Sequence, residues 1–432
     1  MVTTGIIAVT VFILLIISIL FLPKIKIGKI FISTYWLIAL LGATAIIIFK
    51  LLPIEKVIDG LNENSAVNPL KILVLFFSMT MLSVFLDETG LFEFLAKKAV
   101  SVSGTGQFSL FIILYGLTSV LTVFTSNDIV ILTLTPIVCV FCKTAKIDAT
   151  PYLVGEFAAA NTWSMALIIG NPTNIFLATK AEIGFAEYLK TMIIPTLSAG
   201  VTEFLLIALI FFRKLKKPLE PIKEQTFLKD KLAVLIGVIH LSGCLILLAL
   251  SDKIGVESWA ICALFAVSLA LFALALSFIN KENLKRLGRT VIRLPYQLIP
   301  FVVSMFIIVL ALEGSGIVGL LGEVLGEKSA VWVYGFSSAV SANLINNIPM
   351  SMLYSSLTSR LGSAVYEKAV YASVIGSNIG AFITPLGALA GIMFTSLTEK
   401  CGAKYGFKEF IKYGVIISVP TITVALAVLS VI

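Results

Sequence analysis

Two pairs of polar, asparagine-bearing interruptions break the hydrophobic segments of this chain, and they constrain its fold more than any other feature. In the first half, residues 125–128 (TSND) are followed by residues 170–174 (GNPTN). In the second half, residues 346–349 (NNIP) are followed by residues 376–380 (GSNIG), and the chain then runs into 384–387 (TPLG). Interrupted helices at corresponding positions of two halves indicate the binding site of a secondary transporter. We therefore expect two repeats, each with a re-entrant hairpin and a broken helix.

The composition places most of the chain in lipid. Of its 432 residues, 59% are hydrophobic and only 13% are charged, which is more apolar surface than a water-soluble protein of this length could bury. Apolar runs of about 20 residues fit membrane-crossing helices, whereas a membrane β-barrel would alternate apolar and polar residues. The sequence predicts an all-α polytopic membrane protein of the prokaryotic inner membrane, with about 10–12 transmembrane helices. The start of the chain lacks the basic region of a signal peptide, so we expect a retained first helix.

The apolar segments that flank the interruptions are too short to cross a membrane alone, and we expect them to form re-entrant hairpins or half-helices. The candidate segments are approximately 4–22, 31–52, 69–86, 107–125, 129–142, 151–169, 189–212, 231–250, 257–279, 295–312, 329–345, 348–359, 366–383, 386–398 and 409–431.

Basic residues between the segments orient the chain, because cytoplasmic loops are enriched in lysine and arginine. Lys24, Lys26 and Lys29 follow the first segment, so we expect the N-terminus to lie outside. The basic stretches 213–231 and 280–293 should both be cytoplasmic. This assignment puts residues 86–91 (LDETGL) and 312–317 (LEGSGI) on opposite faces, so the two repeats have inverted topology.

The predicted segments and their orientation divide the chain into five parts. Residues 1–66 form N-terminal transmembrane helices, 67–212 form repeat 1, and 213–230 form a basic cytoplasmic linker. Residues 231–294 supply scaffold helices that open the second half, and 295–432 form repeat 2.

The polar residues at the interruptions are the candidate substrate-binding groups, since unwound backbone and amide side chains can bind solute where they line a cavity. These candidates are Ser126, Asn127, Asn171, Thr173, Asn174, Asn346, Asn347, Ser377, Asn378 and Thr384. Across the repeats, Asn127 corresponds in position to Asn346, and Asn161 corresponds to Asn378. Glycines that allow close approach and prolines that stop helices define the breaks, namely Gly170, Pro172, Pro349, Gly376, Gly380, Pro385 and Gly387. The alternative is that these small and amide residues only pack helices together.

Asp128 and Glu156 are the candidate groups for a coupling ion. Intramembrane carboxylates are costly and usually functional, so either could carry a proton or bind a cation. Asp128 could instead cap a half-helix, and Glu156 could lie near the membrane surface. Glu203 is ambiguous in the same way, and the single histidine, His240, fits a satisfied core position better than a proton relay.

Several function classes find no support in the sequence. It has no Walker-type phosphate loop, no hydrolytic triad and no set of metal ligands, so we expect neither an enzyme nor a cofactor. Five scattered cysteines do not form a disulfide framework. Cys139 and Cys142 share a helix face, either as apolar filler or as a thiol pair for a thiophilic solute. The net charge of +8 fits basic cytoplasmic loops beside a lipid bilayer and does not point to nucleic acid.

The interruptions resemble the ion transporter superfamily, in particular its arsenite permease branch. The resembling stretches are 126–128 leading to 135–138 (TPIV), 170–175, 346–349, and 371–380 (YASVIGSNIG) through 383–387. The resemblance covers nearly the whole chain from about residue 30. It departs from the arsenite permease pattern at Asn161 and Asn378, where those proteins often have Asp, and at Phe382, where they have Lys. These departures put proton coupling at those positions in doubt, so that either Asp128 takes over this role or the substrate differs.

The resemblance implies efflux of arsenite or antimonite driven by protons, in some members with a cytoplasmic ATPase subunit. It also implies relatives that move sodium, dicarboxylates, citrate or other anions. We therefore expect a secondary transporter of a small inorganic oxyanion or its neutral acid that works by alternating access. A sodium- or proton-coupled carboxylate transporter and a sodium–proton antiporter stay open as alternatives, as does assembly into a homodimer.

Overall fold

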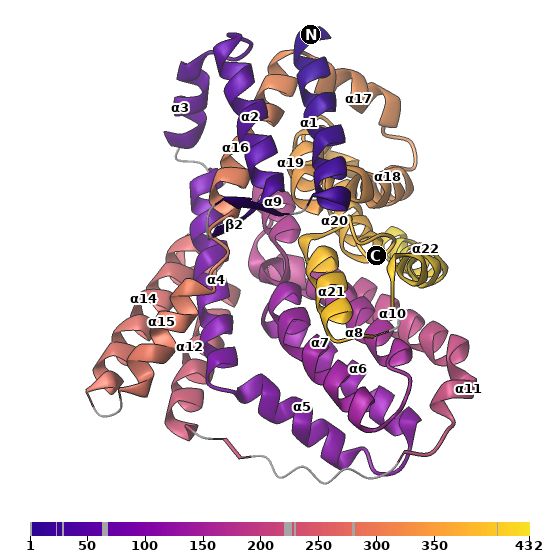
Figure 1. Cartoon of the computed structure of the whole chain (residues 1–432). Coiled ribbons are helices and arrows are strands. Elements are labelled where there is room, and N and C mark those ends of the chain that lie inside the picture. The colour runs from indigo at the N-terminus through magenta and orange to yellow at the C-terminus, as the bar shows by residue number, and fades with distance from the viewer. Residues whose placement is uncertain are drawn as a thin grey trace.

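The first two hydrophobic helices form an antiparallel pair at one end of the molecule (Figure 1). Helix α1 (Val2–Phe21) leads through a short antiparallel hairpin, β1 (Lys24–Ile27) and β2 (Ile30–Ser33), into α2 (Thr34–Ile48). Helix α3 (Ile54–Asn62) then leads towards the first repeat. This computed structural model describes residues 2–22, 24–27, 30–62, 68–219, 227–228, 230–278, 281–403 and 405–432.

The first repeat is a series of seven α-helices with two interruptions. Its helices are α4 (Pro69–Glu88), α5 (Leu91–Val102), α6 (Gln107–Phe124), α7 (Asn127–Thr144), α8 (Thr150–Trp163), α9 (Pro172–Lys180) and α10 (Phe185–Ile210). The chain breaks between α6 and α7, which form a helical hairpin, and again between α8 and α9. The second break contains two 3₁₀ turns, η1 (Ser164–Ala166) and η2 (Ile168–Gly170).

The second repeat has the same series. Its helices are α16 (Leu298–Gly314), α17 (Ile317–Leu325), α18 (Ala330–Ile345), α19 (Asn347–Thr358), α20 (Ser363–Gly380), α21 (Leu389–Lys400) and α22 (Phe407–Val431). The correspondence extends to the turn after the first helix of each series. Gly90 and Gly316 both have φ of 81°, a left-handed conformation that favours glycine, and each directly precedes the next helix.

A group of helices lies between the two repeats. It consists of α11 (Phe212–Leu215), α12 (Lys231–Ala249), α13 (Ser251–Ile254), α14 (Ser258–Ser277) and α15 (Glu282–Ile292). Helices α12, α14 and α15 pack against α4, beside the rest of the first repeat (Figure 1). The predicted linker 213–230 contains α11, while residues 220–226 and 229 lie outside the described part.

Within the described residues, seven helices are long and apolar enough to cross a membrane: α4, α6, α7, α10, α12, α14 and α22. The pair α16 and α17 also qualifies, although it is bent by 79° at its break. Shorter apolar helices occur at Val2–Ser18, Thr34–Ile48 and Ala330–Ile345, and with them the number reaches the predicted range. The architecture agrees with the predicted all-α polytopic fold.

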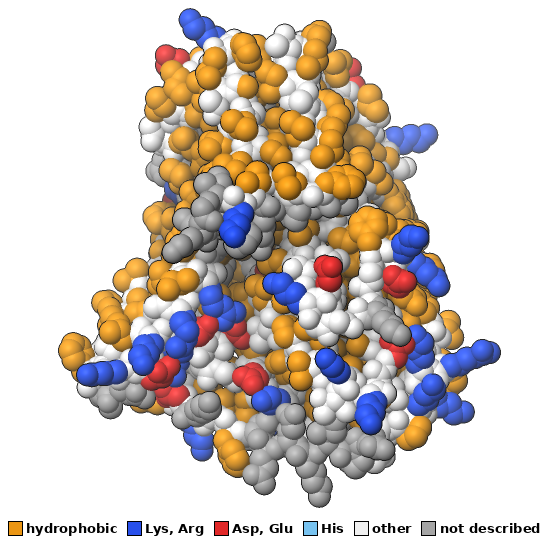
Figure 2. Space-filling model, viewed as in Figure 1, with side chains coloured by type: hydrophobic (Ala, Val, Ile, Leu, Met, Phe, Trp, Pro, Cys, Tyr) orange, Lys and Arg blue, Asp and Glu red, His pale blue; other side chains and the backbone are white. Residues whose placement is uncertain are grey.

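Large apolar side chains stay exposed along these helices, as lipid-facing surfaces require. Leu209 of α10 is 74% exposed, and Leu264 of α14 is 63% exposed. Apolar side chains cover most of the end that holds α1 and α2, while charged side chains gather over the other half of this face (Figure 2).

The interior of the second repeat is packed tightly. Helices α18 and α20 approach so closely that a Cβ atom on Gly376 would collide with the carbonyl oxygen of Gly335 and with Ser338 Oγ. Glycine at position 376 therefore sets the distance between these two helices and places the end of α20 in the centre of the protein.

The predicted segments match the helices closely, with a few differences. The basic loop after the first helix contains a strand hairpin, and the segment 151–169 divides into α8 and two 3₁₀ turns. Seven shorter helices were not predicted, because they are too short or too polar to resemble membrane-crossing helices: α3, α5, α9, α11, α13, α15 and α17.

Candidate functional site

The tip of the first hairpin presents Asn127 to the broken helix of the same repeat. The backbone is extended at Ser126, and α7 begins at Asn127. Asn127 Nδ2 donates a hydrogen bond of 3.4 Å to Asn161 Oδ1 on α8. Asn127 is only 1% exposed, and its Oδ1 has no hydrogen-bond partner among the described residues. The hairpin tip therefore holds a buried acceptor that no group in the described structure satisfies.

The break between α8 and α9 is organised by two asparagines. Asn171 has an extended backbone, and its Oδ1 accepts hydrogen bonds from both the backbone nitrogen and the hydroxyl of Thr173, each 3.1 Å long. Pro172 is the first residue of α9, where its missing N–H costs nothing. Asn174 Nδ2 donates to the backbone oxygens of Ser164 at 2.8 Å and Leu167 at 3.0 Å. The side chain of Asn174 thus ties together two backbone carbonyls on either side of the first 3₁₀ turn in the helix break.

Asn378 of the second repeat joins this first-repeat loop. Its Oδ1 accepts hydrogen bonds from Ser164 Oγ at 2.9 Å and from Asn171 Nδ2 at 3.0 Å. Its Nδ2 donates to Asn174 Oδ1 at 2.7 Å and to the backbone oxygen of Val374 at 2.8 Å. Asn378 is fully buried, so these bonds form in the interior. The network links α20 directly to the break between α8 and α9.

The second hairpin tip is bound to the broken helix of its own repeat. Asn346 has a positive φ of 71°, and its Nδ2 donates to the backbone oxygen of Leu386 at 3.1 Å. The backbone nitrogen of Asn347 donates to Gly387 O at 3.0 Å. Asn343 Oδ1 accepts from both the backbone nitrogen and the hydroxyl of Thr384, at 2.9 Å and 2.7 Å. The loop that contains Pro385 is therefore held against the hairpin tip.

The predicted residues form three groups. Asn127 and Asn161 lie at one hairpin tip, and Asn346, Asn347 and Thr384 lie at the other, while the Asn378 network connects the two broken helices. Among the described residues, no hydrogen bond joins Asn127 to Asn346. Ser377 Oγ donates only to Val374 O of its own helix, at 3.0 Å. Pro349 is buried in the first turn of α19.

Two residues of these networks were not among the predicted binding residues. Asn343 and Ser164 both lie close to a break, and Asn343 is an amide inside a segment that is otherwise mainly apolar. That isolated amide was the available signal. Ser164 carried none, because serine is common in membrane helices.

A cavity of about 510 Å³ opens next to the first hairpin tip. Ser126 and Asp128 line it from the tip, Tyr35 lines it from α2, and Arg293 and Gln297 line it from the segment that joins α15 and α16. Asp128 is half-buried, and no hydrogen bond or ion pair engages its carboxyl among the described residues. The cavity thus contains a carboxyl group directly beside Asn127.

Glu156 is buried at a distance from this cavity. Its side chain is 3% exposed, and its Oε1 accepts a hydrogen bond of 2.7 Å from Thr135 Oγ1 on α7. Its Oε2 has no partner among the described residues.

Cys139 and Cys142 are buried on α7. His240 has both ring nitrogens engaged, Nδ1 with Ile236 O at 2.8 Å and Nε2 with Ser268 Oγ at 3.1 Å.

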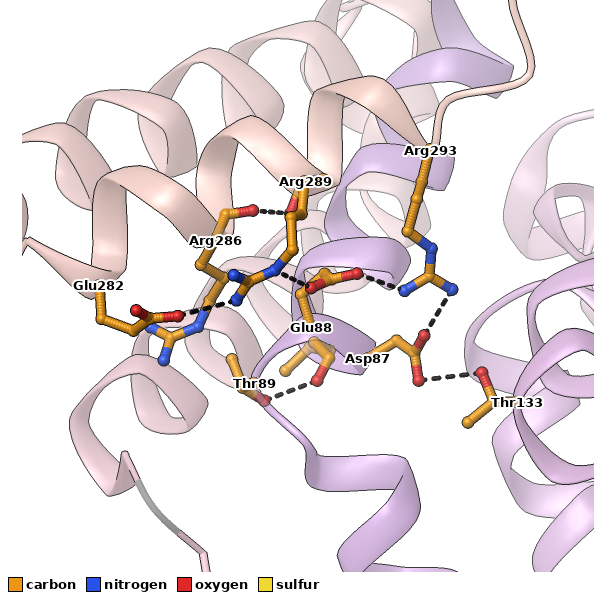
Figure 3. Close-up of polar contacts among 10 residues, drawn as sticks. Asp87, Glu88, Thr89, Thr133, Glu282, Arg286, Arg289 and Arg293 are labelled. Carbon is orange, nitrogen blue, oxygen red and sulfur yellow. Dashed lines mark hydrogen bonds and ion pairs between the residues drawn. The ribbon is translucent and has the colours of Figure 1, made fainter. Parts of the chain in front are cut away.

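An ion-pair cluster lies at the edge of the cavity (Figure 3). Arg293 Nη2 contacts Asp87 Oδ2 at 2.6 Å, and Arg293 Nη1 contacts Glu88 Oε1 at 2.6 Å. Arg289 Nε contacts the other oxygen of Glu88 at 2.7 Å. Asp87 Oδ1 also accepts a hydrogen bond of 2.9 Å from Thr133 on α7. The two acidic residues connect α4, α15 and the hairpin helix α7.

Comparison with known proteins places this architecture in a family. A family model described as "Citrate transporter" (CitMHS) matches residues 12–376. The arsenical pump membrane protein of Escherichia coli strain K12 is 30% identical over 380 residues, which cover 82% of this chain and 85% of that protein. The 46 kDa membrane protein of Mycobacterium leprae is 23% identical over 422 residues, covering 92% of this chain and 96% of that protein.

A solved structure shares the fold. The YdaH transporter of Alcanivorax borkumensis aligns with a TM-score of 0.53 at 15% identity, and the alignment covers 99% of this chain and 97% of that one. Together with the helix series described above, this similarity confirms the predicted fold class. The family model spans most of the chain, and the chain is therefore a multi-pass membrane transporter that belongs to the CitMHS family of the ion transporter superfamily.

Proposed function

We propose that this chain exports arsenite or antimonite as the undissociated acid, in exchange for protons and by alternating access. The observation that carries the proposal is the Oδ1 of Asn127, which has no hydrogen-bond partner in the described part of the chain. A buried acceptor without a donor costs about 1–3 kcal/mol, so a ligand that brings a donor gains affinity there. Undissociated arsenous acid is small, uncharged and carries hydroxyl donors, and it needs no compensating charge.

The remaining amides support the same proposal. Asn161, 3.4 Å from Asn127 at the hairpin tip, offers both donor and acceptor atoms. The neighbouring cavity reaches the tip through Ser126 and gives a solute a route of approach. We assign solute binding to this tip and to its counterpart around Asn346 and Thr384. The Asn378 network holds the two broken helices in place between these tips.

Coupling to protons is assigned to Asp128, with Glu156 as a second carrier. Asp128 faces the cavity and has no hydrogen-bond or ion-pair partner among the described residues, so protons can reach it. Glu156 is buried and does not line this cavity, and its Oε2 has no hydrogen-bond partner within the described part of the chain.

A carboxylate transporter is the second candidate, and a different observation favours it. Helices α7, α9, α19 and α21 all begin at the interruptions. Helix N-termini carry partial positive charge and attract anions. The matched family model is also that of citrate transporters. A citrate or dicarboxylate anion would be received by these helix ends and would require coupled sodium ions or protons.

The proposed orientation follows from the basic residues. We place the N-terminus outside, and α11 and α15 on the cytoplasmic side of a bacterial inner membrane. Labelling of single cysteines introduced at position 2 and position 284 in intact cells tests this orientation. A membrane-impermeant reagent should label only the first, and the reverse pattern would invert the assignment.

The test of function is growth of a bacterium that lacks its own arsenite pump, over a range of arsenite concentrations. Expression of this chain should raise the tolerated concentration. The double variant Asn127→Ala, Asn346→Ala should lose that protection at equal membrane expression, while Ser373→Ala, which removes a buried local hydrogen bond on α20, should retain it. A well-expressed protein that gives no protection contradicts arsenite export, and uptake of citrate and dicarboxylates into proteoliposomes then tests the second candidate.

A further inference from the structure

A second buried carboxyl group lies on the other side of the broken helix. Glu203 of α10 is 1% exposed. Thr162 Oγ1 of α8 donates a hydrogen bond to Glu203 Oε2, and Tyr115 OH of α6 lies 3.1 Å from Glu203 Oε1. Thr162 directly follows Asn161, the partner of Asn127 at the hairpin tip. Glu203 therefore connects three helices at the end of α8.

Within the described ranges, Glu203 has no basic partner in this position. The titratable side chain that faces it from the neighbouring helices is Tyr115. Helix α8 presents Thr162 to it, while Glu156, two turns earlier on the same helix, is bonded to Thr135 of α7. No lysine, arginine or histidine among the described residues forms an ion pair or hydrogen bond with Glu203. A carboxylate held in the interior by hydroxyl groups alone is costly, and this usually marks a functional group.

The geometry around Tyr115 suits two protonation states of Glu203. The tyrosine hydroxyl has one hydrogen and two acceptors within reach, Glu203 Oε1 at 3.1 Å and Gly200 O at 2.8 Å. If Glu203 is ionised, Tyr115 can donate to it. If Glu203 is protonated, its own O–H can donate to the tyrosine oxygen while Tyr115 donates to Gly200 O. Both arrangements are made without moving a heavy atom.

A further contact holds the tyrosine oxygen in place for either arrangement. Trp163 Nε1 lies 3.4 Å from Tyr115 OH and can donate to it in both states. The indole ring of Trp163 packs against Gly200 so closely that a Cβ atom there would collide with it. The tryptophan is the last residue of α8, so the end of the broken helix is part of the same network.

We propose that Glu203, Tyr115 and Thr162 form a proton-binding site at the end of the broken helix α8. This site is additional to Asp128 and Glu156. Its role in coupling rests on the proposed function, since proton binding at Glu203 neutralises the carboxylate that accepts the hydrogen bond of Thr162, next to Asn161. Proton binding itself is a property of the protein without solute and can be measured whatever the solute is.

Infrared difference spectroscopy of the purified full-length protein in lipid, without solute, tests the site. Spectra recorded at acidic and alkaline pH should contain a C=O band of a protonated carboxyl group that is absent from Glu203→Gln and present in Asp128→Asn. Tyr115→Phe keeps the ring but removes the tyrosine oxygen that accepts the hydrogen bond of the protonated Glu203 carboxyl group. This variant should therefore shift the band. Coincident spectra of wild type and Glu203→Gln would overturn the proposal. If Glu203→Gln does not fold, an unshifted set of carboxyl bands in Tyr115→Phe would do the same.

A transport measurement separates this inference from the proposed function. In proteoliposomes, Glu203→Gln should retain exchange of arsenite for arsenite but lose accumulation driven by a pH gradient. Wild-type protein that moves no arsenite under either condition contradicts the proposed function, while the infrared spectra still decide whether Glu203 binds a proton. A Glu203→Gln variant that keeps full proton-driven accumulation overturns its role in coupling.

Discussion

Asn378 of the second repeat accepts a hydrogen bond from Asn171 of the first repeat, with 3.0 Å between Nδ2 and Oδ1. The bond lies in the interior, where both side chains are almost fully inaccessible to solvent. It connects two interruptions that are 207 positions apart in sequence. The two breaks therefore form one polar network, with Asn378 as its shared member.

Replacing Asn378 should damage both stability and transport. Asn378→Ala leaves Asn171 Nδ2 without a partner among the described residues, while Ser164 Oγ keeps Asn161 O and Asn174 Oδ1 keeps Thr173 Oγ1. An unpaired buried polar group costs about 1–3 kcal/mol, and we expect a loss of that size in unfolding free energy. Thermal unfolding in detergent measures it. Ser373→Ala, one turn earlier on the same helix, is the control, and equal losses in the two variants would refute a special role for Asn378.

Asp128→Asn should abolish proton-driven transport while leaving the fold intact. The carboxyl group faces the cavity without a hydrogen-bond partner in the described structure, so the amide fits the same space and breaks no contact. Gradient-driven transport by purified protein in liposomes is the measurement, with unfolding temperature as the check on folding. Unchanged coupled transport in this variant would disprove the assignment of coupling to Asp128.

Arg293→Gln should destabilise the contact between α4 and α15. It removes the shared partner of Asp87 and Glu88, whose side chains are 8% and 12% exposed. Arg293 itself is 35% exposed, so solvent screens part of the interaction, and we expect a loss of about 1–3 kcal/mol. A double-mutant cycle with Asp87→Asn measures the coupling. Strictly additive losses would show that the pair contributes nothing.

The pair of Asp148 and Lys214 should stabilise the protein in a pH-dependent way. Burial acts to raise the pKa of Asp148, but the hydrogen bonds from Lys214, at 2.6 Å, and from the Thr150 backbone outweigh it and lower the pKa. A carboxyl whose pKa is lower in the folded state stabilises that state above the pKa of the unfolded chain, about 3.9 for Asp. This stabilisation is lost as the pH falls through the folded pKa.

The expected effect of Asp148 is small, because both side chains are more than 40% exposed. Asp148→Asn should therefore cost less than about 1 kcal/mol at pH 7. Unfolding temperatures of wild type and variant, measured from pH 7 downwards, should converge as the carboxyl becomes protonated. A difference that grows towards acidic pH would contradict the sign of this effect.

The sequence predicted the helices and interruptions well, because both depend on local patterns. Apolar runs predict membrane helices from length alone, and the breaks at residues 125–126 and 164–171 carry their own polar residues. Pairing across the repeats was less exact. Asn127 was matched with Asn346, whereas the helix starts align Asn127 with Asn347 and Ser126 with Asn346. Two adjacent asparagines offer no sequence signal for choosing between these registers.

Contacts between distant segments could not be predicted. These contacts depend on how the helices pack after folding. They include the hydrogen bonds of Asn378, the ion pair of Arg293 with Asp87, and the hydrogen bond between Tyr115 and Glu203. The positions of the acidic residues 87–88 and of the basic residues in 285–293, at the ends of apolar segments, predicted that both groups would lie near a membrane surface. They did not predict that the two groups would pair with one another.

The sharing of Asn378 bears on how such a protein could have arisen. The central network takes Ser164, Asn171 and Asn174 from one repeat and Asn378 from the other, so a single repeat has only part of it. An ancestor with one repeat could have completed the network only by pairing with a second copy inserted in the opposite orientation. Fusion of the two copies would have fixed that pairing, after which each half was free to change its own asparagines.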